Sequence, residues 1–197
     1  SSAILVVLGW IDTFILGIFE SDDVVGIYSV SLKIATLTSF GLQAINSILA
    51  PKISAAYKQE DMITFKKLIR FSTRLNFLIT LLLISVIIIF HCYILEFFGE
   101  EFLAGSIILL ILSIGQVVNS LSGSVGVILQ MTGHQTKFRN FVLIALITNI
   151  ILNLIFTPIY GAIGIAVSTV ISMALWNLLG TIYLKKKLNI ITYYNFR

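Results

Sequence analysis

Long apolar runs, separated by short polar or charged stretches, divide the chain into segments of membrane-spanning length. A helix needs about 20 apolar residues to cross a hydrocarbon core of about 30 Å. The longest run, from Asn140 to Leu184, holds 45 uncharged residues. As helix it would be about 68 Å long, so turn residues at 157–161 are expected to divide it. The predicted spans are residues 3–19, 24–50, 75–95, 106–130, 140–157 and 160–184.

The composition supports this interpretation. Of 197 residues, 58% are hydrophobic and 11% charged, and the mean hydropathy is +1.03. Soluble domains usually contain about 25% charged residues. We therefore exclude a soluble enzyme, a nucleic-acid-binding protein and a disordered tail, and we predict an all-α integral membrane protein built as a six-transmembrane-helix bundle.

The basic residues predict the orientation of the chain. Twelve of the thirteen lie in three regions. The first is the connection at 54–74 with its flanks, the second is the connection between the fourth and fifth spans, and the third is the tail at 185–197. Basic residues favour the cytoplasmic side, so both termini are expected to be cytoplasmic. The 54–74 connection is amphipathic, and it is either a solvated loop or an interfacial helix on anionic lipid. The net charge of +4 thus points to membrane lipids rather than nucleic acid.

Two charged residues lie inside the predicted spans, Asp12 in the first and Lys33 in the second. A charge in mid-span costs about 2.5–3.5 kcal/mol on insertion scales, so each should face protein or water. As helix, Asp12 lies about 12 Å from Glu20 and Lys33 about 15 Å from Asp23, at the two ends of one short turn. Antiparallel helices would bring the two to similar depth, where we expect an ion pair or a shared hydrated site.

Uncharged polar residues extend this pattern. The polar face of the second span runs from Ser29 to Ser47 and includes Lys33 and Gln43. The fourth span has a polar face containing Gln116 and Asn119. Asn149 and Asn153 lie one turn apart in the fifth span, where hydrogen bonds between helices are favoured over substrate contact.

Nothing in the pattern indicates bond chemistry. The outer connections are too short for a catalytic domain, and His91 and Cys92 have no further His or Cys nearby, so neither a metal site nor a cofactor is expected. Continuous polar faces within six spans indicate a conduit or carrier. Because the first span begins within three residues of Ser1, we expect the chain to be the C-terminal part of a longer membrane protein.

Several stretches resemble one family in order and spacing. Residues 10–17 and 25–34 are similar to the opening of the C-terminal lobe of polysaccharide repeat-unit flippases, which belong to the multidrug/oligosaccharidyl-lipid/polysaccharide exporter (MOP) superfamily. Residues 48–54, 129–133 and 149–164 resemble later stretches of that lobe. The resemblance covers nearly the whole chain.

The resemblance implies a MATE-like fold, in which two six-helix lobes form a V around a central cavity and alternate its access across the bacterial cytoplasmic membrane. The partners would be the N-terminal lobe of the same protein, membrane lipids and the cargo. That cargo would be a polyprenyl-pyrophosphate-linked oligosaccharide repeat unit of O-antigen, capsule or exopolysaccharide.

For such a cargo, Lys33 is the expected contact for pyrophosphate or a sugar acid, and Asp12 is a coupling or pairing group. Gln43, Gln116 and Asn119 would hydrogen-bond sugar hydroxyls. The first alternative is a MATE-type cation-coupled multidrug antiporter, which would favour acids and aromatics in its cavity. A membrane glycosyltransferase or polysaccharide ligase is the second, and the short outer connections disfavour it.

Overall fold

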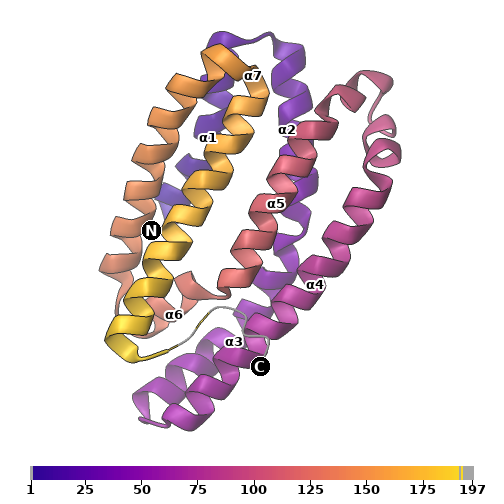
Figure 1. Cartoon of the computed structure of the whole chain (residues 1–197). Coiled ribbons are helices and arrows are strands. Elements are labelled where there is room, and N and C mark those ends of the chain that lie inside the picture. Colours follow the sequence, from indigo (N-terminus) through magenta and orange to yellow (C-terminus); the bar gives the residue numbers. More distant parts are fainter. Residues whose placement is uncertain (1, 191, 193–197) are drawn as a thin grey trace.

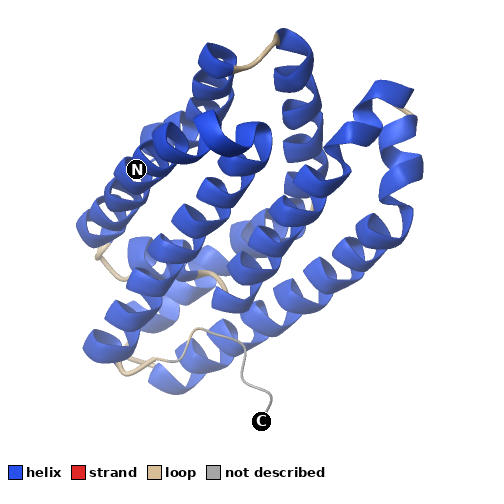
Figure 2. Cartoon of the chain, turned by 45° about the horizontal axis from the view of Figure 1, so that its top comes forward, coloured by secondary structure: helices blue, strands red, loops and turns tan. Residues whose placement is uncertain are grey.

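The computed structural model describes residues 2–190 and 192, which form a helical bundle without a strand (Figure 2). The all-α prediction is therefore confirmed for this part of the chain. In order along the chain, the elements are α1 (Ser2–Phe19), α2 (Asp22–Leu37), α3 (Ser39–Lys58), α4 (Met62–Glu96), the 3-10 helix η1 (Glu100–Gly105), α5 (Ser106–Ser122), α6 (Val125–Met131) and α7 (Gln135–Leu188).

Three segments among the described residues are long and apolar enough to cross a membrane, namely α4, η1 with α5, and α7. Helices α2 and α3 make a fourth if the bent pair is one span. The chain is thus a multi-pass membrane protein. The predicted number of six crossings is not confirmed by length and composition, because α7 counts as one helix and the stretch Gly9–Phe19 of α1 is too short to count by itself.

Helix α7 turns back on itself at Gly161, so its 54 residues form two arms that run side by side (Figure 1). A straight helix of this length would measure about 81 Å, far more than a membrane core. Gly161 has φ 54° and ψ −137°, a conformation that side-chain-bearing residues rarely adopt. A Cβ there would also lie 2.7 Å from Oε1 of Glu20. The reversal falls within the predicted turn at 157–161, and we call residues 135–160 the first arm and 162–188 the second arm.

The predicted span 24–50 is two helices, α2 and α3, which meet at an angle of 42°. Hydroxyl groups around Thr38 bond to the preceding turn of backbone: Thr38 Oγ1 donates to the Ala35 carbonyl at 2.8 Å, and Ser39 Oγ donates to the Thr36 carbonyl at 2.7 Å. Such bonds compete with the helical ladder and bend helices. The predicted span 106–130 is likewise divided, at Gly123 between α5 and α6.

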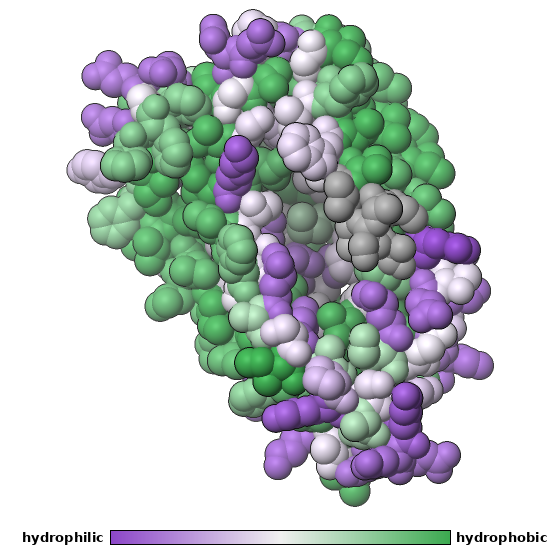
Figure 3. Space-filling model, turned by 180° about the vertical axis from the view of Figure 1, so that it is seen from behind, coloured by the Kyte–Doolittle hydropathy of each residue, from purple (hydrophilic) through white to green (hydrophobic). Residues whose placement is uncertain are grey.

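Hydrophilic side chains gather at the two ends of the bundle, and the surface between them is mostly apolar, with a band of polar side chains down its middle (Figure 3). We call the end with the α3–α4 and α6–α7 corners the basic end, and the end with the α1–α2 and α4–η1 connections the acidic end (Figure 1). The basic end includes Lys58, Lys66, Lys67, Arg70, Lys137, Arg139, Lys185, Lys186 and Lys187. The acidic end includes Glu20, Asp22, Asp23, Glu96, Glu100 and Glu101.

The buried apolar side chains form two clusters. One joins α1, α2, α4, α5 and α7 and includes Leu16, while the other joins α3, α4, α6 and α7 and includes Ile53. The predicted connection at 54–74 contributes to the second cluster. Phe65 and Ile69 are buried there, in the first two turns of α4. This stretch is therefore helical apart from 59–61, and its apolar face packs against protein rather than lipid.

Candidate functional site around Asp12

The carboxylate of Asp12 lies in the interior of the bundle, where side chains from three other segments donate hydrogen bonds to it. The residue is 2% exposed. Thr169 Oγ1 lies 2.6 Å and the Tyr28 hydroxyl 3.2 Å from Oδ2, while Asn153 Nδ2 lies 2.8 Å from Oδ1. Tyr28 belongs to α2, Asn153 to the first arm of α7 and Thr169 to the second. The buried acid thus ties four segments of the fold together.

The Thr169 hydroxyl has partners for either protonation state of Asp12. Its oxygen lies 2.6 Å from Asp12 Oδ2 and 2.9 Å from the carbonyl oxygen of Ile165. A hydroxyl has one hydrogen to donate and can accept at the same time. When Asp12 is ionised, Thr169 donates to the carboxylate. When Asp12 is protonated, it can donate to Thr169, whose hydrogen then turns to Ile165.

Two amides from the first arm of α7 extend the polar surroundings of the carboxylate. Asn153 Nδ2 donates to Asp12 and also lies 3.1 Å from Asn149 Oδ1. Asn149 Nδ2 and Asn153 Oδ1 are buried without a protein partner. Buried polar atoms are nearly always paired, and leaving one unpaired costs about 1–3 kcal/mol. The neighbourhood of Asp12 therefore has hydrogen-bonding capacity that the protein itself does not use.

Asp12 and Lys33 line the same groove, which has a volume of about 420 Å³. Thr13 of α1, Ser29 and Thr36 of α2, and Thr169 of α7 also line it, together with Trp10 and Met173. Lys33 is exposed, and no ion pair within 4.0 Å joins it to Asp12 among the described residues. Asp12 and Lys33 thus line one groove without a direct pair in this conformation, and the shared hydrated site stays a prediction.

The remaining predicted site residues lie outside this groove. Gln43 is exposed on α3, beyond the bend, where its Nε2 lies 3.4 Å from Ser39 Oγ. Gln116 is buried in α5. Asn119 accepts a hydrogen bond from Asn177 Nδ2 at 3.1 Å, which joins α5 to the second arm of α7. Their proposed contact with sugar stays a prediction.

Tyr28 and Thr169 are the members of the site that the sequence did not predict. Each stands beside a serine in a largely apolar stretch, and Thr169 is separated from Asp12 by 157 positions. The aspartate itself was the available signal, since a buried acid requires donors. Among residues 2–190 and 192, no group of three or more His, Cys, Asp or Glu side chains is placed to hold a metal ion.

A family model decides the classification, since the MatE model matches residues 1–159. The chain belongs to the MatE family. This confirms the predicted superfamily. No solved structure matches the chain.

Two curated relatives of this MatE chain come from the archaeon Haloferax volcanii. The chain is 28% identical to the probable low-salt glycan biosynthesis flippase Agl15 over 182 residues, which are 92% of this chain and 39% of that protein. It is 27% identical to the probable flippase AglR over 180 residues, which are 90% of this chain and 38% of that protein. The chain thus spans about two fifths of the length of these relatives. Because both are archaeal, the predicted bacterial membrane is not confirmed.

Proposed function

We propose that the complete protein is a flippase that carries a lipid-linked oligosaccharide across the cytoplasmic membrane by alternating access. The observation that carries this proposal is the groove of about 420 Å³ between α1, α2 and α7, which combines Lys33 with the hydrogen-bonded carboxylate of Asp12. It lies in a MatE chain whose curated relatives are named as flippases, one of them of glycan biosynthesis.

The chemistry of the groove suits a phosphate-bearing headgroup. Such a group cannot cross about 30 Å of hydrocarbon unaided, because an unpaired charge there is very costly. Lys33 supplies a cation at the groove, and Thr13, Ser29 and Thr36 supply hydroxyl groups. We propose that Lys33 contacts the phosphate and that the cargo is a polyprenyl-pyrophosphate-linked repeat unit of a cell-surface polysaccharide.

Asp12 has the geometry of a coupling group. It can hold or release a proton without losing its hydrogen bond to Thr169, because that hydroxyl can reverse its direction toward the Ile165 carbonyl. We propose that protonation of Asp12 accompanies the change between inward-facing and outward-facing states. The unpaired atoms Asn149 Nδ2 and Asn153 Oδ1 give the site one further donor and one further acceptor, to which water beside the carboxylate can bond.

The charge asymmetry of the bundle supports an orientation with the basic end in the cytoplasm. Counting α2 with α3, α5 with α6, and each arm of α7 separately, the proposed lobe crosses the membrane six times. An N-terminal lobe of the same protein would form the other wall of the cavity, opposite the groove of Asp12 and Lys33.

The test is to delete the gene and measure in which leaflet the lipid-linked oligosaccharide accumulates. We expect accumulation in the cytoplasmic leaflet, relieved by the wild type and by Lys33→Arg but not by Lys33→Ala. Lys58→Ala is the matched control, because Lys58 is an exposed lysine at the basic end. Full rescue by Lys33→Ala would refute the headgroup contact. Normal glycan with lost resistance to cationic compounds would identify the multidrug antiporter instead.

A further inference from the structure

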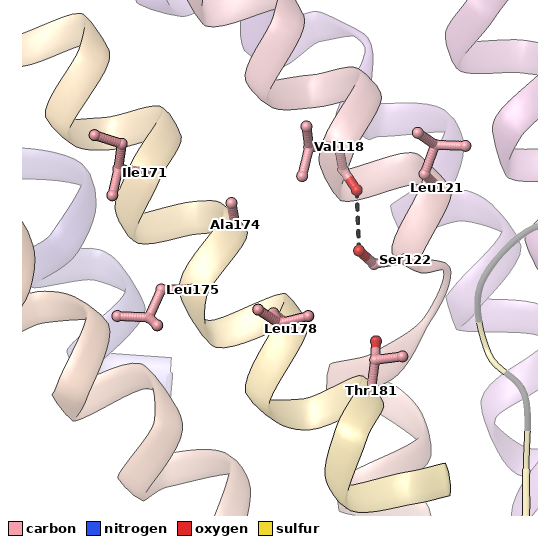
Figure 4. Close-up of a pocket in the computed structure, with 8 residues that line it drawn as sticks. All are labelled: Val118, Leu121, Ser122, Ile171, Ala174, Leu175, Leu178 and Thr181. Atoms are coloured by element: carbon pink, nitrogen blue, oxygen red, sulfur yellow. Dashed lines mark hydrogen bonds between the residues drawn. The ribbon is translucent and has the colours of Figure 1, made fainter.

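A second groove, of about 570 Å³, lies between α5 and the second arm of α7 (Figure 4). Its side chains come from the last turns of α5 and the middle of the second arm. They are Val118, Leu121, Ser122, Ile171, Ala174, Leu175, Leu178 and Thr181. Six of these eight are aliphatic, so the groove is lined almost entirely by hydrocarbon.

The two hydroxyl groups of this groove already have partners within the chain. Ser122 Oγ donates to the Val118 carbonyl at 3.0 Å, as drawn in Figure 4. Thr181 Oγ1 accepts from the hydroxyl of Thr192, 3.4 Å away. Neither group needs a ligand to satisfy its hydrogen bond. A sugar or a phosphate would therefore lose its water here without compensation, whereas a hydrocarbon chain would lose nothing.

The second arm of α7 places one lysine in line with this groove. Successive residues of a helix are about 100° apart, so every seventh residue returns to nearly the same face. Ile171, Leu178 and Lys185 are spaced by seven, and the helix continues to Leu188. Lys185 is exposed and lies about 10 Å beyond Leu178 along the axis, toward the basic end. Lys187, about 160° away from it around the helix, points to the other side.

We propose that this groove binds an acyl chain of an acidic phospholipid whose phosphate contacts Lys185. An apolar channel that ends at a cation is complementary in both shape and charge to such a lipid. Leu178 is 57% exposed, so the groove is open to the surroundings of the bundle. The site is separate from the proposed cargo site, because Thr169 and Met173 face the groove of Asp12 from the opposite side of the same arm. This proposal does not depend on the proposed function.

The test is native mass spectrometry of the full-length protein, titrated with phosphatidylglycerol or phosphatidylcholine of identical chains. We expect the wild type to retain phosphatidylglycerol preferentially. Lys185→Gln should weaken that retention about fivefold, and Lys187→Gln should leave it unchanged. Equal effects of the two lysine substitutions, or equal retention of the two lipids by the wild type, would overturn the proposal.

A second pair of variants tests the chain-binding part of the groove. Ala174→Phe fills the groove, and Leu178→Asn places an amide on its open side without filling it. Each should lower the retention of phosphatidylglycerol severalfold. Leu178→Asn still tests the proposal if Ala174→Phe does not fold. Retention unchanged in both variants would contradict the proposal. Displacement of phosphatidylglycerol by polyprenyl phosphate would also overturn it, since the occupant would then be the cargo tail.

Discussion

Two buried polar clusters cross-link this bundle, and they differ in charge. The Asp12 cluster consists of Asp12, Tyr28, Asn153 and Thr169. The Gly123 cluster consists of Ser72, Thr73, Asn76, Ser120, Ser124 and Thr192 around Gly123. In the second cluster, Ser72 and Ser124 are 2.8 Å apart and Thr73 donates to the Thr192 carbonyl at 2.9 Å. These hydrogen bonds of the Gly123 cluster join neutral groups.

The difference separates a functional role from a structural one. Neutral groups that bond to one another contribute about 0.5–1.5 kcal/mol per bond and hold helix α4 against the break between α5 and α6. A carboxylate at the same depth is far more expensive to bury, and neutral residues could tie the same helices together. The Asp12 cluster also borders a groove with a lysine. We therefore expect substitutions to separate transport from stability.

Asp12→Asn is expected to have the largest effect, which is a loss of transport. The substitution keeps the size of the side chain and removes its charge and its ability to exchange a proton. We expect the transport rate to fall at least about tenfold, with a thermal unfolding midpoint close to that of the wild type. Flipping into proteoliposomes and unfolding in detergent measure the two quantities on the full-length protein. Wild-type transport by this variant would remove Asp12 from the mechanism.

The largest expected effect on stability comes from Gly123→Ala. Gly123 has φ 73°, and a Cβ there would collide with Thr73 Oγ1 and lie 2.7 Å from the Thr192 carbonyl oxygen. Strain and overpacking together should cost about 2–4 kcal/mol, seen as a lower unfolding midpoint. Transport per folded molecule should stay near the wild-type value. Gly133→Ala is the matched control, since Gly133 also has a positive φ but has nothing within 4 Å of its would-be Cβ.

Hydrophobic patterning predicted the helical segments of this fold well, because the membrane demands long apolar runs. Helix α1 covers residues 2–19 where 3–19 was predicted, and the reversal of α7 falls at Gly161. The breaks at Thr38 and Gly123 were missed. Both interrupt runs that remain apolar, and their causes are hydroxyl groups bonded to the backbone and a glycine conformation, neither of which changes the hydropathy.

The candidate site was predicted only as far as local geometry reaches. Asp12 and Lys33 could be placed at one depth because a short turn joins their helices. Periodicity also predicted the polar face of α5. It could not show that this face packs against α7 instead of lining the groove of Asp12, and the Asn119–Asn177 hydrogen bond shows that packing. Which residues of α7 reach Asp12 depends on packing between segments about 140 or more residues apart.

A smaller effect is expected from the Ser72–Ser124 pair, whose oxygen atoms are buried and 2.8 Å apart. Ser72→Ala or Ser124→Ala alone leaves one hydroxyl without its partner and should cost about 1–3 kcal/mol. The double variant should cost less than the sum of the two, with a coupling of about 1 kcal/mol. A double-mutant cycle in detergent measures this value. Strictly additive changes in the free energy of unfolding would show that the two hydroxyls do not stabilise the fold through their hydrogen bond. A loss of transport would show that the Gly123 cluster also has a functional role.

The smallest expected effect lies outside both clusters, at the start of α4. The Thr64 amide donates to Asp61 Oδ1 at 3.0 Å, and hydrogen bonds from Thr64 lower the pKa of this exposed carboxyl below its ordinary value of 3.8. A lowered pKa means that the ionised form stabilises the fold above that value and that this contribution disappears as the pH falls below it. Asp61→Ala should therefore lower the unfolding midpoint slightly at pH 7, and by progressively less as the pH falls below 3.8, with transport unchanged. Asp61→Asn, which keeps a capping oxygen, should lose less. A midpoint as low as that of Gly123→Ala would show that the helix start, rather than the Gly123 cluster, limits the stability of the bundle.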